Sequence, residues 1–176
     1  MVVFTIGHSR RALADFIALL QEAAVERVVD VRSIPRSRTN PQFNTDALSD
    51  SLAAAGIGYV HVKALGGRRH RPRNAPPSRN ELWQNAAFRN YADYAQTDAF
   101  RGGLNELKEL ASRERCAIMC AEAVWWRCHR RIISDYLLAD GIVVAHIMGP
   151  GKTDPATLTP GARRLADGTL AYESQA

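Results

Sequence analysis

Strand-like and helix-like segments alternate along the chain from its first residues, and this alternation constrains the fold more than any other feature. Apolar segments rich in β-branched residues predict five strands, with helix-forming segments between them. The predicted strands are residues 2–6, 27–31, 58–62, 116–120 and 142–147. Strands joined through helices form βαβ crossovers, which give a parallel sheet with helices on both faces. We therefore expect an α/β fold, a single domain with three α/β/α layers and a mostly parallel sheet of about five strands.

The segments between and after the strands complete this prediction. Apolar spacing and helix-forming composition predict helices at residues 13–25, 45–56, 82–96, 104–115 and 130–141. Ser78 and Glu81 have the spacing of a capping box before the third of these helices. Residues 63–80 form the longest irregular segment, and a loop of this length inside a domain is usually functional or partly disordered. We expect the α/β domain to span residues 1–147, followed by an irregular tail at 148–176 with one short helix near Arg163.

Positive charge is concentrated in three segments of the chain. The net charge is +5, yet residues 32–43, 63–80 and 127–131 hold 12 of the 23 lysines and arginines and none of the 18 acids. Such clustering is typical of an anion-binding surface, and solvated basic loops are the alternative.

Nothing in the sequence indicates a membrane segment. No apolar run approaches the roughly 18 residues of a membrane span, and the N-terminal residues lack the basic and apolar regions of a signal peptide. We expect a cytoplasmic protein with no membrane partner. Three cysteines in such a protein favour thiols that pack, react or bind metal over a disulfide framework.

The residue types most often found in binding and catalytic sites fall at the carboxyl ends of the predicted strands, where open parallel sheets bind ligands. Four of the five histidines lie at or just after such an end, and each basic segment begins at the same edge. Solvated basic loops would be as common at the opposite edge, so this coincidence favours one shared site. The candidate ligand-binding residues are Ser9, Asp30, Arg32, Arg36, Arg38, His61, Gly66, Gly67, Arg68, Arg69, Cys128 and Arg130. The candidate catalytic residues are Cys120, His8, Glu122 and His129.

Cys120 is the candidate nucleophile. It lies where a strand passes into a loop before a helix, beside arginines, and positive potential of that kind lowers the pKa of a thiol. The alternative is a small buried hydrophobic residue, which is our expectation for Cys116 inside the strand. A metal site formed by Cys120, Cys128 and His129 is a further alternative, although dense arginines repel cations.

The other candidates also have two interpretations each. Glu122 is either a general acid or base, or a carboxylate that fixes nearby arginines. His8 and His61 either transfer protons or are core histidines with satisfied hydrogen bonds. Asp30, at the end of an apolar strand, is expected to pair with an arginine. The glycine pair before Arg68 suits a close approach of backbone amides to a phosphate.

The motifs "TIGHS", "VVDVRSIPRSRTNPQF", "YVHVKALGG" and "CAE" followed by "CHR" resemble the motif set of the DUF488 family, in the same order over roughly residues 2–147. This resemblance implies a compact α/β fold and leaves the reaction open. The motif residues here are Gly7, His8, Ser9, Asp30, Arg32, Pro35, Ser37, Phe43, Gly66, Gly67, Cys120, Glu122, Cys128, His129 and Arg130. A looser similarity is to rhodanese-like domains, although the glycine-containing cradle of that superfamily does not follow Cys120 here.

Two classes of function follow from these residues. The first is an enzyme that binds a phosphate-bearing ligand, a nucleotide or a nucleic-acid end, at the carboxyl edge of the sheet and uses a cysteine nucleophile. The second is a nucleic-acid-binding module without catalysis, for which the basic loop and the pair Trp125 and Trp126 are the supporting features. The sequence identifies no cofactor.

Overall fold

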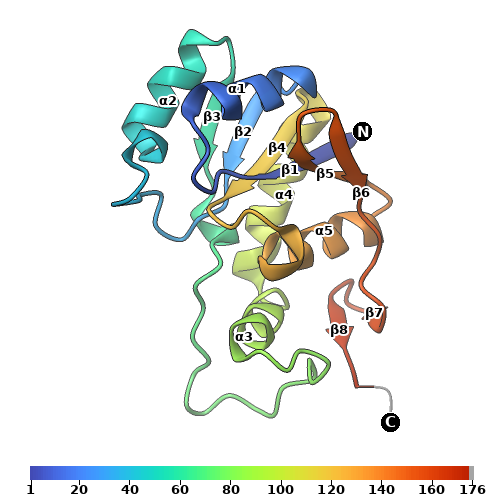
Figure 1. Ribbon diagram of the computed structural model, residues 1–176. Coiled ribbons are helices and arrows are strands. Elements are labelled where there is room, and N and C mark those ends of the chain that lie inside the picture. Colours follow the sequence, from blue (N-terminus) through green and yellow to red (C-terminus); the bar gives the residue numbers. More distant parts are fainter. Residues whose placement is uncertain (175–176) are drawn as a thin grey trace.

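A six-stranded sheet forms the centre of the protein in a computed structural model that describes residues 1–174 (Figure 1). The strand order is β3-β2-β4-β1-β5-β6; strands β1 to β5 pair in parallel, and β6 pairs antiparallel with β5. The parallel strands are β1 (Val2–Gly7), β2 (Arg27–Asp30), β3 (Gly58–His61), β4 (Cys116–Cys120) and β5 (Val143–Gly149). All five predicted strands are therefore present, with ends that differ by one or two residues.

The helices cover both faces of this sheet and confirm the three-layer prediction. On one face, α1 (Leu13–Glu22) and α2 (Thr45–Ala54) pack buried apolar side chains against the strands. On the other face, α4 (Asp98–Arg113) and α5 (Arg130–Ala139) do the same. Every residue of β4 is buried, because this strand lies between β1 and β2 and is covered by helices on both faces.

The third helix begins later than predicted. The structure places α3 at Ala86–Tyr94, where the side chain of Asn85 accepts hydrogen bonds from two backbone amides of the first turn. Ser78 caps no helix, because its hydroxyl donates to the carboxylate of Asp93 within α3. The predicted capping box is therefore wrong, and the residues before Asn85 belong to an extended loop.

The prediction of an irregular tail with a short helix near Arg163 is also wrong. The chain after β5 forms three further strands, β6 (Lys152–Pro155), β7 (Ala162–Arg164) and β8 (Leu170–Tyr172). Strands β7 and β8 pair with each other, and the hydroxyl of Tyr172 donates to Asp135 of α5 at 2.9 Å. Buried contacts of this kind fix the conformation of the segment. The last two residues of the predicted tail lie outside the described residues.

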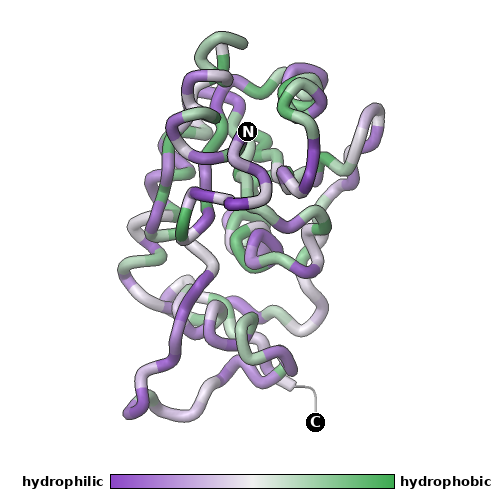
Figure 2. Tube along the Cα trace, turned by 60° about the vertical axis from the view of Figure 1, so that its left-hand side comes forward, coloured by the Kyte–Doolittle hydropathy of each residue, from purple (hydrophilic) through white to green (hydrophobic). Residues whose placement is uncertain are grey.

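The loop between β3 and α3 is long and hydrophilic. After the 3-10 helix η2 (Lys63–Leu65) it contains no helix or strand until Ala86. In Figure 2 the central strands are mainly green, whereas this loop, at the bottom of the molecule, is mainly purple and white. Among the described residues, no helix is long and apolar enough to cross a membrane.

Candidate functional site

A cavity of about 320 Å³ opens beyond the carboxyl ends of β2 and β4. This volume lies at the lower end of the range of small-molecule sites, roughly 300–1,000 Å³. Its walls come from the loops after β2, β3 and β4 and from helix α3. The lining residues are Arg32, Ser33, Ile34, Arg36, Gly67, Arg68, Ala87, Phe88, Tyr91, Cys120, Ala121, Glu122, Arg127, Cys128 and His129.

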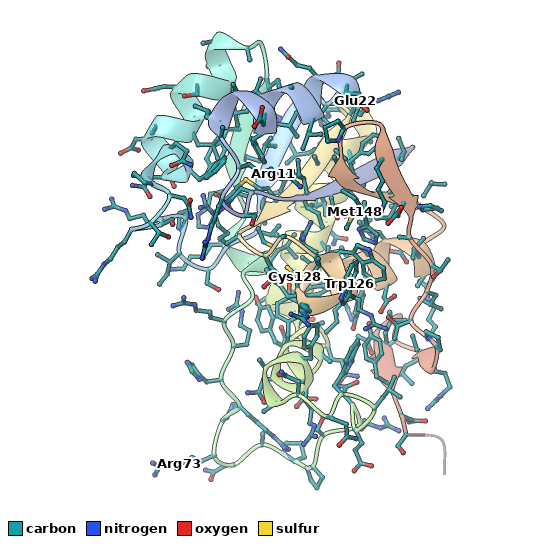
Figure 3. All side chains as sticks on the ribbon, in the orientation of Figure 1. Arg11, Glu22, Arg73, Trp126, Cys128 and Met148 are labelled. Carbon is teal, nitrogen blue, oxygen red and sulfur yellow. The ribbon has the colours of Figure 1, made fainter. Side chains whose placement is uncertain are left out.

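Two cysteine sulfurs meet in the wall of this cavity. Cys120 ends β4, and Cys128 follows the 3-10 helix η3 (Trp125–Arg127) just before α5, so the intervening loop folds back on itself. Their Sγ atoms are 2.7 Å apart, within hydrogen-bond distance. Figure 3 shows Cys128 between the edge of the sheet and α5. A hydrogen bond therefore joins the two sulfurs inside the wall of the cavity.

The hydrogen bonds around the two sulfurs differ, and this decides which one carries charge. Cys128 Sγ accepts from the backbone N–H and from Nε of Arg130, and it lies 3.5 Å from Nδ1 of His129. Burial alone would raise the pKa of Cys128, but the hydrogen bond from Cys120 and the influence of His129 and Arg130 hold that pKa well below its ordinary value. Burial and the interaction with Cys128 raise the pKa of Cys120. These contacts favour the thiolate on Cys128 over Cys120, with Cys120 as the hydrogen-bond donor.

Arg130 provides an independent argument for this thiolate. Its side chain is 1% exposed, and within residues 1–174 it forms no ion pair with a carboxylate. Besides Cys128, the guanidinium donates to the hydroxyl of Thr5 and to the backbone carbonyl of Glu122. A buried cation needs a compensating anion, and the sulfur of Cys128 is the group in position to supply it.

His129 is oriented for proton exchange with Cys128. Its Nε2 donates to the carbonyl oxygen of Val31 at 2.8 Å, which leaves Nδ1 facing the sulfur. Gly67 makes room for the ring, because a Cβ there would lie 2.5 Å from Nδ1. This arrangement lets the imidazole take the thiol proton and return it to a leaving group.

Arg32 lines the cavity, yet its charge is already compensated. The guanidinium forms a bidentate pair with Asp30, as the sequence predicts, and donates to the carbonyl of Phe43. It also donates to Nε2 of His8 at 3.3 Å, while Nδ1 of His8 donates to the carbonyl of Ser9. Burial lowers the pKa of His8, so the ring is neutral at neutral pH. His8 is thus a buried support for Arg32 and does not line the cavity.

Three other arginines at the cavity have free guanidiniums. Arg36, Arg68 and Arg127 are exposed, and among the described residues none of them forms an ion pair. The backbone N–H of Arg68 donates to the side chain of Ser33, which joins the loops after β2 and β3. Glu122 is the one acidic residue of the lining. The lining therefore carries more positive than negative side chains.

Several predicted site residues lie outside the cavity lining. Arg69 covers the ring of Tyr94 and donates to backbone carbonyls near its own loop. His61 donates to the carbonyl of Arg32, and Arg38 is exposed to solvent. The remaining residues of this group are Ser9, Asp30, Gly66 and Arg130.

Glu122 does not act as a carboxylate clamp for arginines. Its side chain is exposed and forms no ion pair within residues 1–174, and its backbone carbonyl accepts the hydrogen bond from Arg130. The two tryptophans do not line the cavity, because Trp125 stacks on His146 at 4.5 Å and makes an edge contact with Trp126.

Sequence reasoning missed the apolar wall of the cavity and one of its arginines. Phe88 and Tyr91 come from α3, which carries no motif and whose position depends on non-local packing. Arg127 belongs to a basic segment that the sequence does reveal, but a charge pattern alone cannot tell a lining arginine from any other exposed one.

The described part of the chain contains no group of three or more His, Cys, Asp or Glu side chains placed to hold a metal ion. The metal alternative for Cys120, Cys128 and His129 therefore gains no support from the geometry.

The fold and the cavity define a class: α/β proteins with a buried cysteine pair in an electropositive cavity at the carboxyl edge of a parallel sheet. Residues 12–137 match the family described as "Domain of unknown function DUF488", and the chain belongs to this family. No curated protein and no solved structure matches the chain.

Proposed function

We propose that the protein is an enzyme that binds a phosphate-bearing ligand, a nucleotide or a nucleic-acid end, and attacks it with the thiolate of Cys128. One observation carries this proposal. Cys128, compensated by the buried Arg130, lies in the wall of a cavity whose mouth carries three free arginines. An anion-binding rim and an activated nucleophile thus belong to one cavity of suitable size.

The lining favours an anion that also carries an apolar ring. Arg36, Arg68 and Arg127 supply guanidiniums, which bind phosphate oxygens in a bidentate manner. Phe88 and Tyr91 provide aromatic surface in the same cavity, and aromatic rings stack on nucleobases. A nucleotide combines both groups, whereas inorganic phosphate would leave the apolar wall unused.

The chemistry assigned to the cysteine is a displacement. The Sγ of Cys128 forms a bond to an electrophilic centre of the ligand, and the bond to the leaving group breaks with its electron pair. The leaving group takes its proton from Nδ1 of His129, which received it when the thiol ionised. Cys120, whose pKa is raised, remains a neutral hydrogen-bond donor during this step.

A matched pair of arginine variants tests ligand binding. Arg36 lines the cavity, whereas Arg38, two positions later in the same loop, is exposed and lies outside the lining. We expect Arg36→Gln to weaken mononucleotide binding about tenfold, because one phosphate contact is lost, and Arg38→Gln to leave it unchanged. Isothermal titration with nucleotides and phosphosugars measures both, and equal effects of the two substitutions would contradict the proposal.

A cysteine variant separates binding from catalysis. Cys128→Ser should keep ligand binding, because the arginines remain, and should abolish turnover, because a serine hydroxyl is a far weaker nucleophile at neutral pH. Unchanged turnover in Cys128→Ser would place the chemistry elsewhere.

A nucleic-acid-binding module without catalysis is the second candidate, and the loop after η2 favours it. Arg68, Arg71, Arg73 and Arg79 are exposed along this loop, and the segment 63–80 contains no acid. Figure 3 shows Arg73 at the far tip of the loop, away from Cys128. Such a surface binds the backbone of a polyanion in a strongly salt-dependent manner.

Affinity for a single-stranded oligonucleotide decides between the two candidates. If the loop is the binding surface, Arg71→Gln with Arg73→Gln lowers both the affinity and the salt dependence, and Cys128→Ser changes neither. If the cavity is the binding site, Arg36→Gln weakens the binding of the oligonucleotide. The two loop substitutions then leave the affinity for mononucleotides unchanged.

A further inference from the structure

The wall of the cavity contains two sulfurs in contact, and a single nucleophile does not require this. Cys120 and Cys128 belong to different elements, and the loop 121–127 returns the chain so that the Sγ atoms lie 2.7 Å apart. Both residues line the cavity, and Cys120 is 3% and Cys128 5% exposed. Cys116, on the same strand, is fully buried and does not line the cavity.

The two sulfurs have unequal partners, which gives each a different role. Cys128 receives hydrogen bonds from Arg130 and faces His129, and so carries the negative charge. Cys120 has the sulfur of Cys128 and, at 3.8 Å, the carbonyl of Glu122 as its partners. One sulfur is thus prepared to attack, and the other holds a proton beside it.

We infer that Cys128 and Cys120 form a dithiol centre that a hydroperoxide oxidises reversibly to a disulfide, with Cys128 as the attacking sulfur and Cys120 as the resolving one. This inference does not depend on which anion the arginines bind. It adds a modification site to the cavity. It also predicts that Cys128 can no longer act as a nucleophile once its sulfur is part of the disulfide.

The two steps balance. The thiolate of Cys128 attacks one peroxide oxygen; an S–O bond forms, the O–O bond breaks, and hydroxide (or an alkoxide) leaves with the electron pair. The sulfur of Cys120 then attacks the sulfenic acid; an S–S bond forms, the S–O bond breaks, and the departing hydroxyl leaves as water with the proton of Cys120. The dithiol loses two electrons and the peroxide gains them. An external thiol restores the pair by exchange, becoming a disulfide itself.

Peptide mapping of the full-length protein tests this inference. Protein treated with one equivalent of hydrogen peroxide is alkylated, digested with trypsin and analysed by mass spectrometry. Cleavage after Arg127 places the sulfurs on separate peptides, residues 116–127 and 128–130. We expect these two peptides to be joined, with fragmentation placing the crosslink at Cys120 and an alkylated, previously free thiol at Cys116. Dithiothreitol should release the crosslink.

Three variants assign the roles. In Cys120→Ser, peroxide should leave a sulfenic acid on Cys128 that dimedone traps, because no resolving sulfur remains. In Cys128→Ser, Cys120 should stay reduced under the same conditions. Cys116→Ser is the matched control and should form the crosslink as the native protein does.

Other outcomes overturn the inference. They are a crosslink through Cys116, over-oxidation of Cys128 in native protein without a crosslink, or no reaction of either sulfur. Nucleotide binding to the reduced protein is measured separately, so failure of the dithiol inference and failure of the proposed function give different results.

Discussion

Arg130 links the interior of the molecule to the chemistry of the cavity. The sequence places this arginine in a basic segment, where it resembles its neighbours Arg127 and Arg131. The structure buries it and gives it a sulfur as its anionic partner. The contact with Arg130 lowers the pKa of Cys128, whereas burial alone would raise it.

Replacement of Arg130 should therefore suppress the thiolate. We expect Arg130→Met to slow the alkylation of Cys128 at neutral pH by about tenfold or more, because its pKa rises without the guanidinium. Peptide-resolved reaction with iodoacetamide measures this rate. The matched control is Arg131→Met, since Arg131 contacts Thr159 and the ring of Trp83 and no sulfur. An unchanged rate in Arg130→Met, with Cys116 still protected by an intact fold, would mean that the charge of Cys128 has another origin.

His146, which is linked to Arg130 through Thr5, should make the stability of the protein depend on pH. Its Nδ1 lies 2.7 Å from the hydroxyl of Thr5, which also accepts from Arg130. Burial, together with the charge of Arg130, lowers the pKa of His146 to about 4. An unfolded chain protonates this histidine near pH 6.5, so the folded state loses stability as the pH falls from about 6.5 toward 4.

Urea unfolding at pH 7 and pH 5 tests this expectation. The native protein should lose roughly 1–2 kcal/mol over this interval from His146, and His146→Gln should lose less because glutamine does not titrate. His8, whose pKa is also lowered by burial, contributes in the same direction and remains in the variant. An equal loss in both proteins would show that His146 is protonated in the folded state.

At the scale of elements, the parts determined by local pattern were predictable and the parts determined by packing were not. The five parallel strands follow from short β-branched segments, and their order in the chain fixes the edge at which the motif residues gather. The strands of the C-terminal segment depend on partners such as Asp135, which is distant in sequence. The predicted capping box failed because Ser78 bonds Asp93 inside α3, while Asn85 caps the helix. The cavity was predictable to the extent that it is built from loops after strands, and its α3 wall was not.

The contact between β1 and the loop after β4 depends on Gly7. A Cβ at this position would lie 1.9 Å from the carbonyl oxygen of Glu122, which is the oxygen that accepts from Arg130. Gly7→Ala should therefore displace the loop that carries the cavity wall and lower the free energy of unfolding by about 2 kcal/mol or more.

Gly102 offers the matched control for this substitution. It lies inside α4, and a Cβ there meets nothing within 4 Å. Gly102→Ala should raise the free energy of unfolding by about 0.5–1 kcal/mol, because alanine favours the helix. Chemical denaturation of both variants measures the difference, and a Gly7→Ala protein as stable as the native one would show that the loop is free to move.

On the scale of the whole molecule, charge and fold act together. The basic segments 32–43, 63–80 and 127–131 are far apart in the chain, and the parallel sheet brings parts of all three to one cavity. The sequence predicted this convergence. It predicted that Asp30 pairs with an arginine, but it did not identify Arg32 as that arginine or Cys128 as the sulfur that contacts Arg130, because both depend on side-chain partners that only the folded chain provides.

The alkylation rate of Cys128 in the native protein, followed over pH and with increasing mononucleotide, tests these conclusions most directly. We predict a rate that reaches its plateau well below the ordinary thiol pKa of about 8.5, exceeds the rates of Cys116 and Cys120, and falls in a saturable manner as nucleotide fills the cavity. A Cys128 that titrates at or above the ordinary value, or whose rate is indifferent to every phosphate-bearing ligand, would contradict the account.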